Sequence, residues 1–301
     1  MPDLVPIALF AFRRPEHTRR TLEALASNPE FAQSPLHIFC DGSRGAADEA
    51  AVLATRAVVR SWTHRNKTII EASANRGLAA SIIDGVTRLC ASHGNVIVVE
   101  DDLVVAPVFL DFVNRALEVY ADEPRVMQVS GHMFAVDLPP GGPDAVFMPF
   151  TTSWGWATWQ RAWAQFDPQM RAFERLQADR VLRRRFDLDH AYPYFEMLKK
   201  QKVGKIDSWA IRWYLSVFNV DGLVLYPRRS LVNNEGFDGS GTNCDGLTGG
   251  GDRDLCIAVD LLERLPDVVL DARAFQLVSA ILRSQNTLVE RTTRYLKRRL
   301  G

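Results

Sequence analysis

Three consecutive acidic residues, Glu100, Asp101 and Asp102, follow an apolar run and are the group in this sequence best suited to chemistry. The run itself, Val96 to Val99, is β-branched without polar alternation, which predicts a strand buried on both faces. In open α/β sheets the ligand crevice lies outside the carboxyl ends of the strands, so these acids are expected to line a site. Adjacent carboxylates repel one another, and a hard divalent cation such as Mn²⁺ or Mg²⁺ offsets that repulsion while sharing its shell with substrate phosphate.

The same acids have a second interpretation that involves no ligand. Carboxylates are favoured at helix N-termini, and a helix is expected to begin near Pro107. A solvated acidic turn ahead of that helix is therefore the alternative to a cation and diphosphate site.

The elements that must position the acids are strands alternating with helices. Strands are predicted at 5–12, 36–40, 67–72, 96–100 and 126–130, and a helix is predicted after each of the first four. This alternation predicts an α/β fold with a wound, mostly parallel sheet, right-handed crossovers and flanking helices. Further strands are expected at 145–150 and 224–227, where the regular alternation no longer holds.

Composition limits the kinds of partner that the chain is expected to have. The 301 residues carry no formal net charge, which argues against a nucleic-acid partner. There is no apolar run of the roughly 18 residues that a membrane span needs and no basic-then-apolar leader, so a cytoplasmic protein is expected. The four cysteines form no C-x-x-C pair, which predicts reduced thiols without a zinc site.

Six of the seven tryptophans lie between Trp154 and Trp213. Trp159 and Trp163 are four positions apart, as in a helix that packs on a core. Trp154 and Trp156 flank Gly155, and a glycine between two indoles has two interpretations. The indoles belong to the core, or the glycine lets the backbone approach a flat ligand such as a sugar ring.

Two late segments carry their own predictions. Seven glycines between Gly236 and Gly251 are typical of a lid or a binding loop. Residues 275–300 keep one apolar helical stripe, and residues 280–301 hold six basic residues and one acid. Such a helix packs on its own domain, pairs with a second subunit in a homodimer, or lies peripherally on the inner face of an anionic membrane.

With these pieces in place, the chain resembles the GT-A glycosyltransferases, and within them the N-acetylglucosaminyltransferase I group and its bacterial relatives in polysaccharide synthesis. The most specific match is "VVEDDLVVAPVFLDF", which is similar to that group's Glu-Asp-Asp variant of the Asp-x-Asp motif. Looser matches are "AFRRPEHTRRTL", "CDGS", "SWGWATWQRAW" and "IDSWAIRW". The resemblance implies a nucleotide-sugar donor, most often a UDP-sugar, a divalent cation (Mn²⁺ or Mg²⁺) and inverting transfer to a hydroxyl of a glycan or lipid-linked glycan.

The resemblance also implies roles for individual residues near the donor. Asp102 would be the direct metal ligand, Asp101 would face the ribose, and Glu100 would face the donor sugar or support it by a hydrogen bond. Asp41 would hold the uracil or ribose, and Arg14 would lie near the nucleotide, although the adjacent Arg13 leaves that alignment open. The turn with Asn75 and Arg76 would shape the nucleotide pocket. Residues 1–130 would form the donor half, residues 131–270 the acceptor half and residues 271–301 a basic amphipathic helix.

Inverting transfer also needs a carboxylate base on the acceptor side, away from the metal. Asp207 in "GKIDSWAIRW" is the candidate, because its flanking tryptophan matches the base-bearing stretch of the family. The family has two acids before that tryptophan, whereas this chain has Asp207 followed by Ser208. The alternative role for Asp207 is the N-cap of a helix over 208–218. Asp167, Asp189 and Glu235 are further candidates for the base.

Two other classes of protein fit parts of the pattern. A metal-dependent nucleotidyltransferase is also α/β, but "AFRRPEHT" lacks the glycine that its phosphate loop needs after the first strand. A non-catalytic protein that binds sugar nucleotides with the same fold is the second alternative, favoured if the base is missing.

Overall fold

The computed structural model describes residues 4–237 and 264–286. An eight-stranded sheet in the order β3-β2-β1-β4-β8-β6-β9-β7 runs through the molecule, and β5 pairs with β10 in a separate two-stranded sheet. The strands are β1 Ile7–Ala11, β2 Leu36–Cys40, β3 Lys67–Glu71, β4 Asn95–Glu100, β5 Leu103–Val105, β6 Val126–Ser130, β7 Ala145–Met148, β8 Trp156–Trp159, β9 Leu223–Pro227 and β10 Val232–Asn234.

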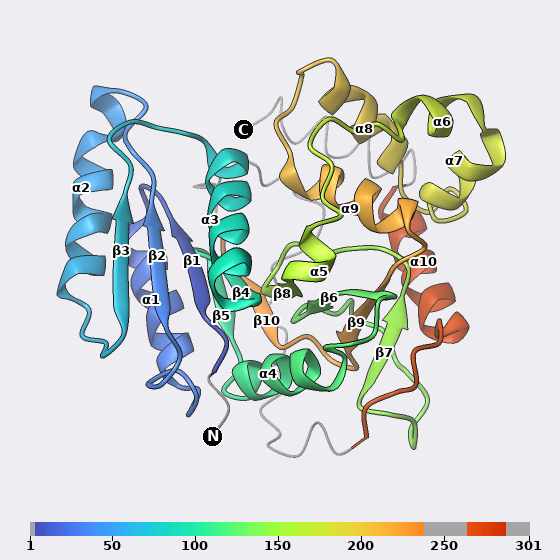
Figure 1. Ribbon diagram of the computed structural model, residues 1–301, viewed down its shortest axis with the longest axis horizontal. Helices are drawn as coiled ribbons and strands as arrows, with labels where there is room; N and C mark the ends of the chain where they lie inside the picture. Colours follow the sequence, from blue (N-terminus) through green and yellow to red (C-terminus); the bar gives the residue numbers. More distant parts are fainter. Residues whose placement is uncertain (1–3, 238–263, 287–301) are drawn as a thin grey trace.

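Helices flank the sheet on both faces (Figure 1). In that view α3 lies against β1 and β4 and α1 lies behind β1 and β2, while α6, α7 and α8 gather above α9. The helices are α1 Pro15–Ala26, α2 Ala46–Ser61, α3 Leu78–His93, α4 Phe109–Val119, α5 Gln160–Trp163, α6 Phe173–Ala178, α7 Arg180–Phe186, α8 Tyr194–Lys202, α9 Trp209–Asn219 and α10 Ala272–Gln285.

The predicted α/β class with a wound, mostly parallel sheet is confirmed. β3, β2, β1 and β4 run parallel to one another, and β6 and β9 are parallel to each other. β4 is the expected central strand, since Val96 to Val99 are fully buried between β1 and β8. This arrangement places the carboxyl ends of β1 to β4 at one edge of the sheet, where the acids follow β4.

Two features of the sheet depart from the parallel pattern. β8 runs antiparallel between β4 and β6, and β7 runs antiparallel beside β9. The sequence "WATW" of β8 is buried along its whole length, so it has no polar alternation that would mark it as a strand. Its place in the sheet depends on pairing with two strands that lie far away in the chain.

The last described helix, α10, packs its apolar side into the core. Ala274, Val278 and Leu282 are buried, and Asp271 caps the helix by accepting a hydrogen bond from the backbone N–H of Ala274 at 2.8 Å. The first half of the predicted stripe thus covers the protein's own domain, while residues 287–301 lie outside the described part. Within the described residues, no helix combines the length and apolar character needed to cross a membrane. The division at residues 130 and 270 stays a prediction.

Candidate active site

The two aspartates that follow β4 are buried against the turn between β1 and α1. Asp101 and Asp102 are each only 8% exposed. The backbone N–H of Phe12 donates to Oδ2 of Asp101 at 2.8 Å, and Nη1 of Arg14 donates to Oδ2 of Asp102 at 2.7 Å. The parallel pairing of Phe10 with Glu100 aligns the two strand ends, so the turn after β1 meets the acids after β4. The structure therefore brings Arg14, rather than Arg13, to the predicted acids.

These carboxyl groups hold more negative charge than their surroundings offset. Burial, followed by the charge of Asp102, raises the pKa of Asp101 to about 7. Burial and then the charges of Asp102 and Asp101 also raise the pKa of Glu100 well above its usual range. Arg14 lowers both values, but its effect is smaller than that of burial and repulsion. The site therefore has the electrostatic character that favours a bound cation.

The acids fit a cation that is only partly enclosed by protein. Among residues 4–237 and 264–286, no three His, Cys, Asp or Glu side chains converge in a way that could hold a metal ion. Mg²⁺ and Mn²⁺ sites for phosphate substrates commonly use one or two carboxylates and take their other ligands from water and phosphate. Asp101 and Asp102 match that smaller donor set, although Asp102 in this structure is bound to Arg14.

The residues just after β10 form another wall of the site that contains Asp101 and Asp102. The sequence did not predict this contact. β10 pairs antiparallel with β5, and the N–H of Glu235 donates to the carbonyl of Asp102 at 2.9 Å. Arg20 on α1 holds the Glu235 carboxylate at 2.8 Å. A Cβ atom on Gly236 would lie 2.2 Å from Oδ2 of Asp102, so this glycine passes directly over the carboxylate. The rest of the predicted glycine-rich loop, from residue 238, lies outside the described residues.

Asp41, Asn75 and Arg76 come together at the ends of β2 and β3. Oδ1 of Asp41 accepts from the N–H groups of Gly42 and Arg76, both at 2.8 Å. Its Oδ2 accepts from Nδ2 of Asn75 at 3.0 Å and from the N–H of Gly77 at 2.9 Å. A carboxylate has about four lone-pair sites, so Asp41 is saturated by its own chain. In this structure it fixes the turn over 75–77, and its contact with a nucleotide stays a prediction.

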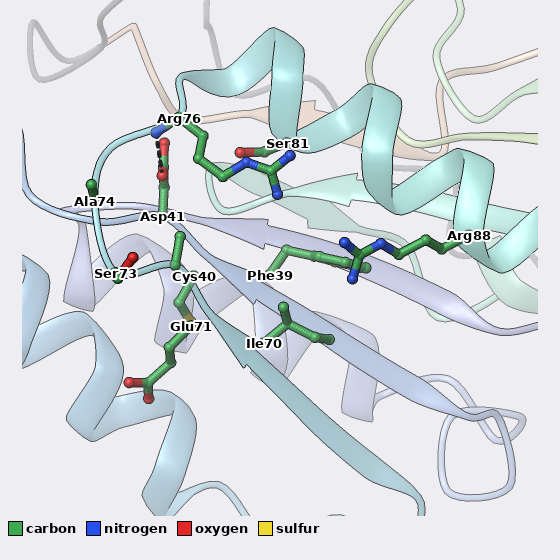
Figure 2. Close-up of a pocket in the computed structure, with 11 residues that line it drawn as sticks. Phe39, Cys40, Asp41, Ile70, Glu71, Ser73, Ala74, Arg76, Ser81 and Arg88 are labelled. Atoms are coloured by element: carbon green, nitrogen blue, oxygen red, sulfur yellow. Dashed lines mark hydrogen bonds between the residues drawn. The ribbon is translucent and has the colours of Figure 1, made fainter.

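A pocket of about 340 Å³ opens beside this turn, between the ends of β2 and β3 and the first turns of α3. Figure 2 shows Arg76 and Arg88 on the side of α3 and Phe39 and Ile70 on the strands. Both arginines bind Asp84, at 3.0 and 2.9 Å, which fixes their positions. The volume lies at the lower end of the range for small-molecule sites. An apolar floor with two guanidinium groups suits a flat, polar-edged ring such as a nucleobase.

Asp207, the predicted base, lies at the amino end of α9 on the surface. Its side chain is 66% exposed, and its Oδ1 accepts from Nη2 of Arg212 at 2.8 Å. The alternative role as N-cap is wrong, because the side chain of Ser208 accepts from the N–H of Ile211. Asp207 therefore does not cap α9, and its role as the catalytic base stays a prediction.

The other candidates for the base have local structural partners. Asp167 accepts from the N–H groups of Gln169 and Arg171, and Asp189 binds Arg184 at 2.8 Å. Glu235 binds Arg20 beside the acid site. Each of these carboxylates thus contributes to a turn or an ion pair in its own neighbourhood.

Trp156 belongs to the core, so it is not part of a sugar-binding pair. Its ring is fully buried and stacks on Trp209 with the centroids 5.0 Å apart. Gly155 has φ +56°, and a Cβ atom there would lie 2.7 Å from Cγ1 of Val232. The glycine therefore lets the backbone turn and lets β10 pack closely, which explains it without a ligand. Trp154 is only partly buried and its ring packs edge-on against His132, with the centroids 4.5 Å apart.

His132 lies at the same edge of the sheet as the acids, and it was not among the residues predicted from the sequence. It follows β6, which runs in the same direction as β4, and it is 3% exposed. Its Nδ1 lies 3.3 Å from Oγ of Ser230. The signal that could have found it is its position just after a strand of the parallel set, where α/β folds place their ligands.

Comparisons with known proteins give similarity to solved structures alone. No protein-family model matches the chain, and no curated protein does. A mannosyltransferase, PcManGT from Pyrobaculum calidifontis, solved with GDP-Man and Mn²⁺, is 18% identical with a TM-score of 0.31, over 42% of this chain and 34% of that one. TarS 1-349 from S. aureus is 10% identical with a TM-score of 0.41, over 77% of this chain and 60% of that one.

Mouse xyloside xylosyltransferase 1, in its apo form, is 13% identical with a TM-score of 0.35 over 72% of this chain and 82% of that one. The chain thus spans 34% of the mannosyltransferase and 60% of TarS. Two of the three are glycosyltransferases by name. TM-scores this low do not carry a function across, so the function is inferred from the side chains of the site.

Proposed function

We propose that the chain is a metal-dependent glycosyltransferase that moves a sugar from a nucleotide diphosphate donor, foremost a UDP-sugar, to a hydroxyl of a glycan or lipid-linked glycan. The observation that carries this proposal is the buried pair Asp101 and Asp102 beside Arg14, at the sheet edge that also holds the 340 Å³ pocket. The buried acids suit a cation, and the guanidinium suits a diphosphate. The pocket with its flat floor suits a nucleobase.

The donor is assigned to this edge residue by residue. The nucleobase of the donor lies in the pocket between Phe39, Ile70 and the two arginines Arg76 and Arg88. The turn fixed by Asp41 shapes the rim of this pocket. The diphosphate lies toward Arg14 and the acids, since a guanidinium binds phosphate oxygens in a bidentate manner. Glu100 lies at the end of β4 within the same acid group, where it supports the donor sugar.

Asp102 would hold the divalent cation, which would supply positive charge to the departing diphosphate, while Asp101 would face the ribose. On the acceptor side, Asp207 removes the proton from the hydroxyl as its oxygen attacks the anomeric carbon opposite the leaving group, which gives inversion. Arg212 keeps the carboxylate of Asp207 oriented through their 2.8 Å contact.

The test separates donor binding from turnover. Thermal unfolding with Mn²⁺ and each of UDP, GDP, CDP and ADP identifies a nucleotide that stabilises the wild-type protein. Asp102→Asn is expected to remove the Mn²⁺-dependent part of that stabilisation. Asp207→Asn is expected to keep it and to lower transfer or donor hydrolysis by roughly 100-fold or more. Asp221→Asn is the matched control, because Asp221 is also exposed and bound to an arginine.

Equal loss of binding and turnover in both variants contradicts the division of roles. The alternative, a protein that binds sugar nucleotides without catalysis, gains support from the exposed, ion-paired state of Asp207. It predicts that nucleotide binding persists while the wild-type protein neither transfers the sugar nor hydrolyses the donor.

A further inference from the structure

Arg14 and Asp102 form an ion pair that is enclosed by protein. The side chains are 12% and 10% exposed, and Nη1 of Arg14 lies 2.7 Å from Oδ2 of Asp102. The same nitrogen lies 3.9 Å from Oδ1 of Asp101, so one guanidinium serves both acids. Because little solvent screens the pair, its electrostatic interaction is stronger than that of an exposed pair.

The backbone at Gly236 also lies close to the oxygen that Arg14 binds. Oδ2 of Asp102 is also the atom that a Cβ atom on Gly236 would approach to 2.2 Å. The guanidinium on one side and the backbone of Gly236 on another leave this oxygen little room for a divalent cation. A cation in direct contact with Oδ2 would also stand beside the positive charge of Arg14, which repels it. The guanidinium and the cation therefore compete for one carboxylate.

Arg14 has an anchored backbone and a long side chain. It directly precedes Pro15, the first residue of α1, and its carbonyl accepts from the N–H of Thr18 at 2.9 Å. Release of Asp102 requires this side chain, which is 12% exposed, to change its rotamer. A diphosphate at this edge offers the guanidinium two acidic oxygens in its preferred fork geometry.

We propose that Arg14 is a built-in counterion that occupies the acids when no substrate is bound and makes cation binding depend on the nucleoside diphosphate. The diphosphate draws the guanidinium away from Asp102, and the freed carboxylate then accepts the cation. This inference rests on the proposed function for the identity of the diphosphate. It assigns Arg14 a positioning role that goes beyond contact with the nucleotide.

The test measures Mn²⁺ binding directly, by titration calorimetry or by the electron paramagnetic resonance of free Mn²⁺, with and without the stabilising nucleoside diphosphate. Wild-type protein is expected to bind Mn²⁺ at least about 10-fold more weakly without the nucleotide than with it. Arg14→Gln is expected to bind Mn²⁺ alone about 10-fold more tightly than the wild type, and to gain little from the nucleotide.

Two control variants keep the result interpretable. Arg13→Gln removes the neighbouring positive charge, which binds Asp48 at 2.7 Å, and is expected to bind Mn²⁺ like the wild type. Arg14→Lys keeps the charge and is expected to keep Mn²⁺ binding weak in the absence of nucleotide. Circular dichroism and a thermal midpoint show that each variant is folded before it is compared.

The outcomes separate this inference from the proposed function. If Arg14→Gln binds Mn²⁺ alone no more tightly than the wild type, the counterion role is wrong, even where the wild type binds Mn²⁺ with nucleotide. If the wild type binds no nucleoside diphosphate but Arg14→Gln binds Mn²⁺ tightly, Arg14 is a counterion of the acids, but its control by the nucleotide and the proposed function both fail. If no protein binds Mn²⁺ under any condition, both proposals fail.

Discussion

A Cβ atom built on Gly236 would lie 2.2 Å from Oδ2 of Asp102, so a side chain at this position would have to displace that carboxylate. Gly236→Ala is expected to displace the carboxylate or the strand end and to weaken Mn²⁺-dependent nucleotide binding on the order of 10- to 100-fold. Titration calorimetry with Mn²⁺ and the nucleotide measures the loss. Gly45→Ala is the control, since a Cβ atom there has open space and the backbone is extended. Equal binding by the two variants would show that Asp102 does not need its present position.

The tryptophan core predicts a loss of stability at Trp156. Its fully buried ring packs against those of Trp163, Trp209 and Trp213. Trp156→Ala is therefore expected to lower the free energy of unfolding by about 3–5 kcal/mol, measured in urea. Its buried Nε1 has no hydrogen-bond partner among the described residues, so Trp156→Phe is expected to cost much less. A variant Trp156→Ala with wild-type stability and lost ligand binding would restore the ligand-binding interpretation.

His37 predicts a pH dependence of stability with a defined sign. Burial, and then the charge of His93, lowers the pKa of His37 below 6.5, so the folded state disfavours its protonated form. The unfolded chain takes up this proton more readily, and stability is therefore lost as pH falls through 6.5. His37→Gln is expected to reduce the fall in the thermal midpoint between about pH 7 and pH 5. His190→Asn, at an exposed histidine, serves as the control. A fall that is unchanged in His37→Gln would contradict the assignment.

Cys40 and Cys90 are expected to be inert thiols in the folded protein. Burial raises the pKa of each to about 12, which leaves almost no reactive thiolate near neutral pH. Iodoacetamide at about pH 8 should therefore label both cysteines only after unfolding, as read by mass spectrometry of their separate peptides. Rapid labelling of either peptide in the native protein would mean that its strand or helix opens readily.

The sequence was most informative where local pattern determines structure. The run Val96 to Val99 has no polar member, which is typical of a strand buried on both faces, and it lies at the centre of the sheet. The resemblance placed Asp41, Asn75 and Arg76 near the nucleotide, and hydrogen bonds join them at the ends of β2 and β3.

Features that depend on distant contacts could not be read in this way. Nothing in "WATW" indicates that β8 pairs with both β4 and β6. Arg14 and Asp102 were both expected at the site, but their ion pair follows from the register of β1 against β4. The wall formed by Glu235 and Gly236 likewise follows from the pairing of β10 with β5. Backbone pairing between strands that are not adjacent in the chain has no local signature.

The position of β8 has a consequence for how the protein is made. β8 begins at Trp156 and lies between β4 and β6, which the ribosome synthesises earlier. A nascent chain that ends before Trp156 therefore exposes the unpaired edges of two apolar strands, a known route to aggregation. Synthesis through this short tryptophan-rich stretch adds β8, so chains that end before Trp156 are expected to aggregate more readily than chains that include it.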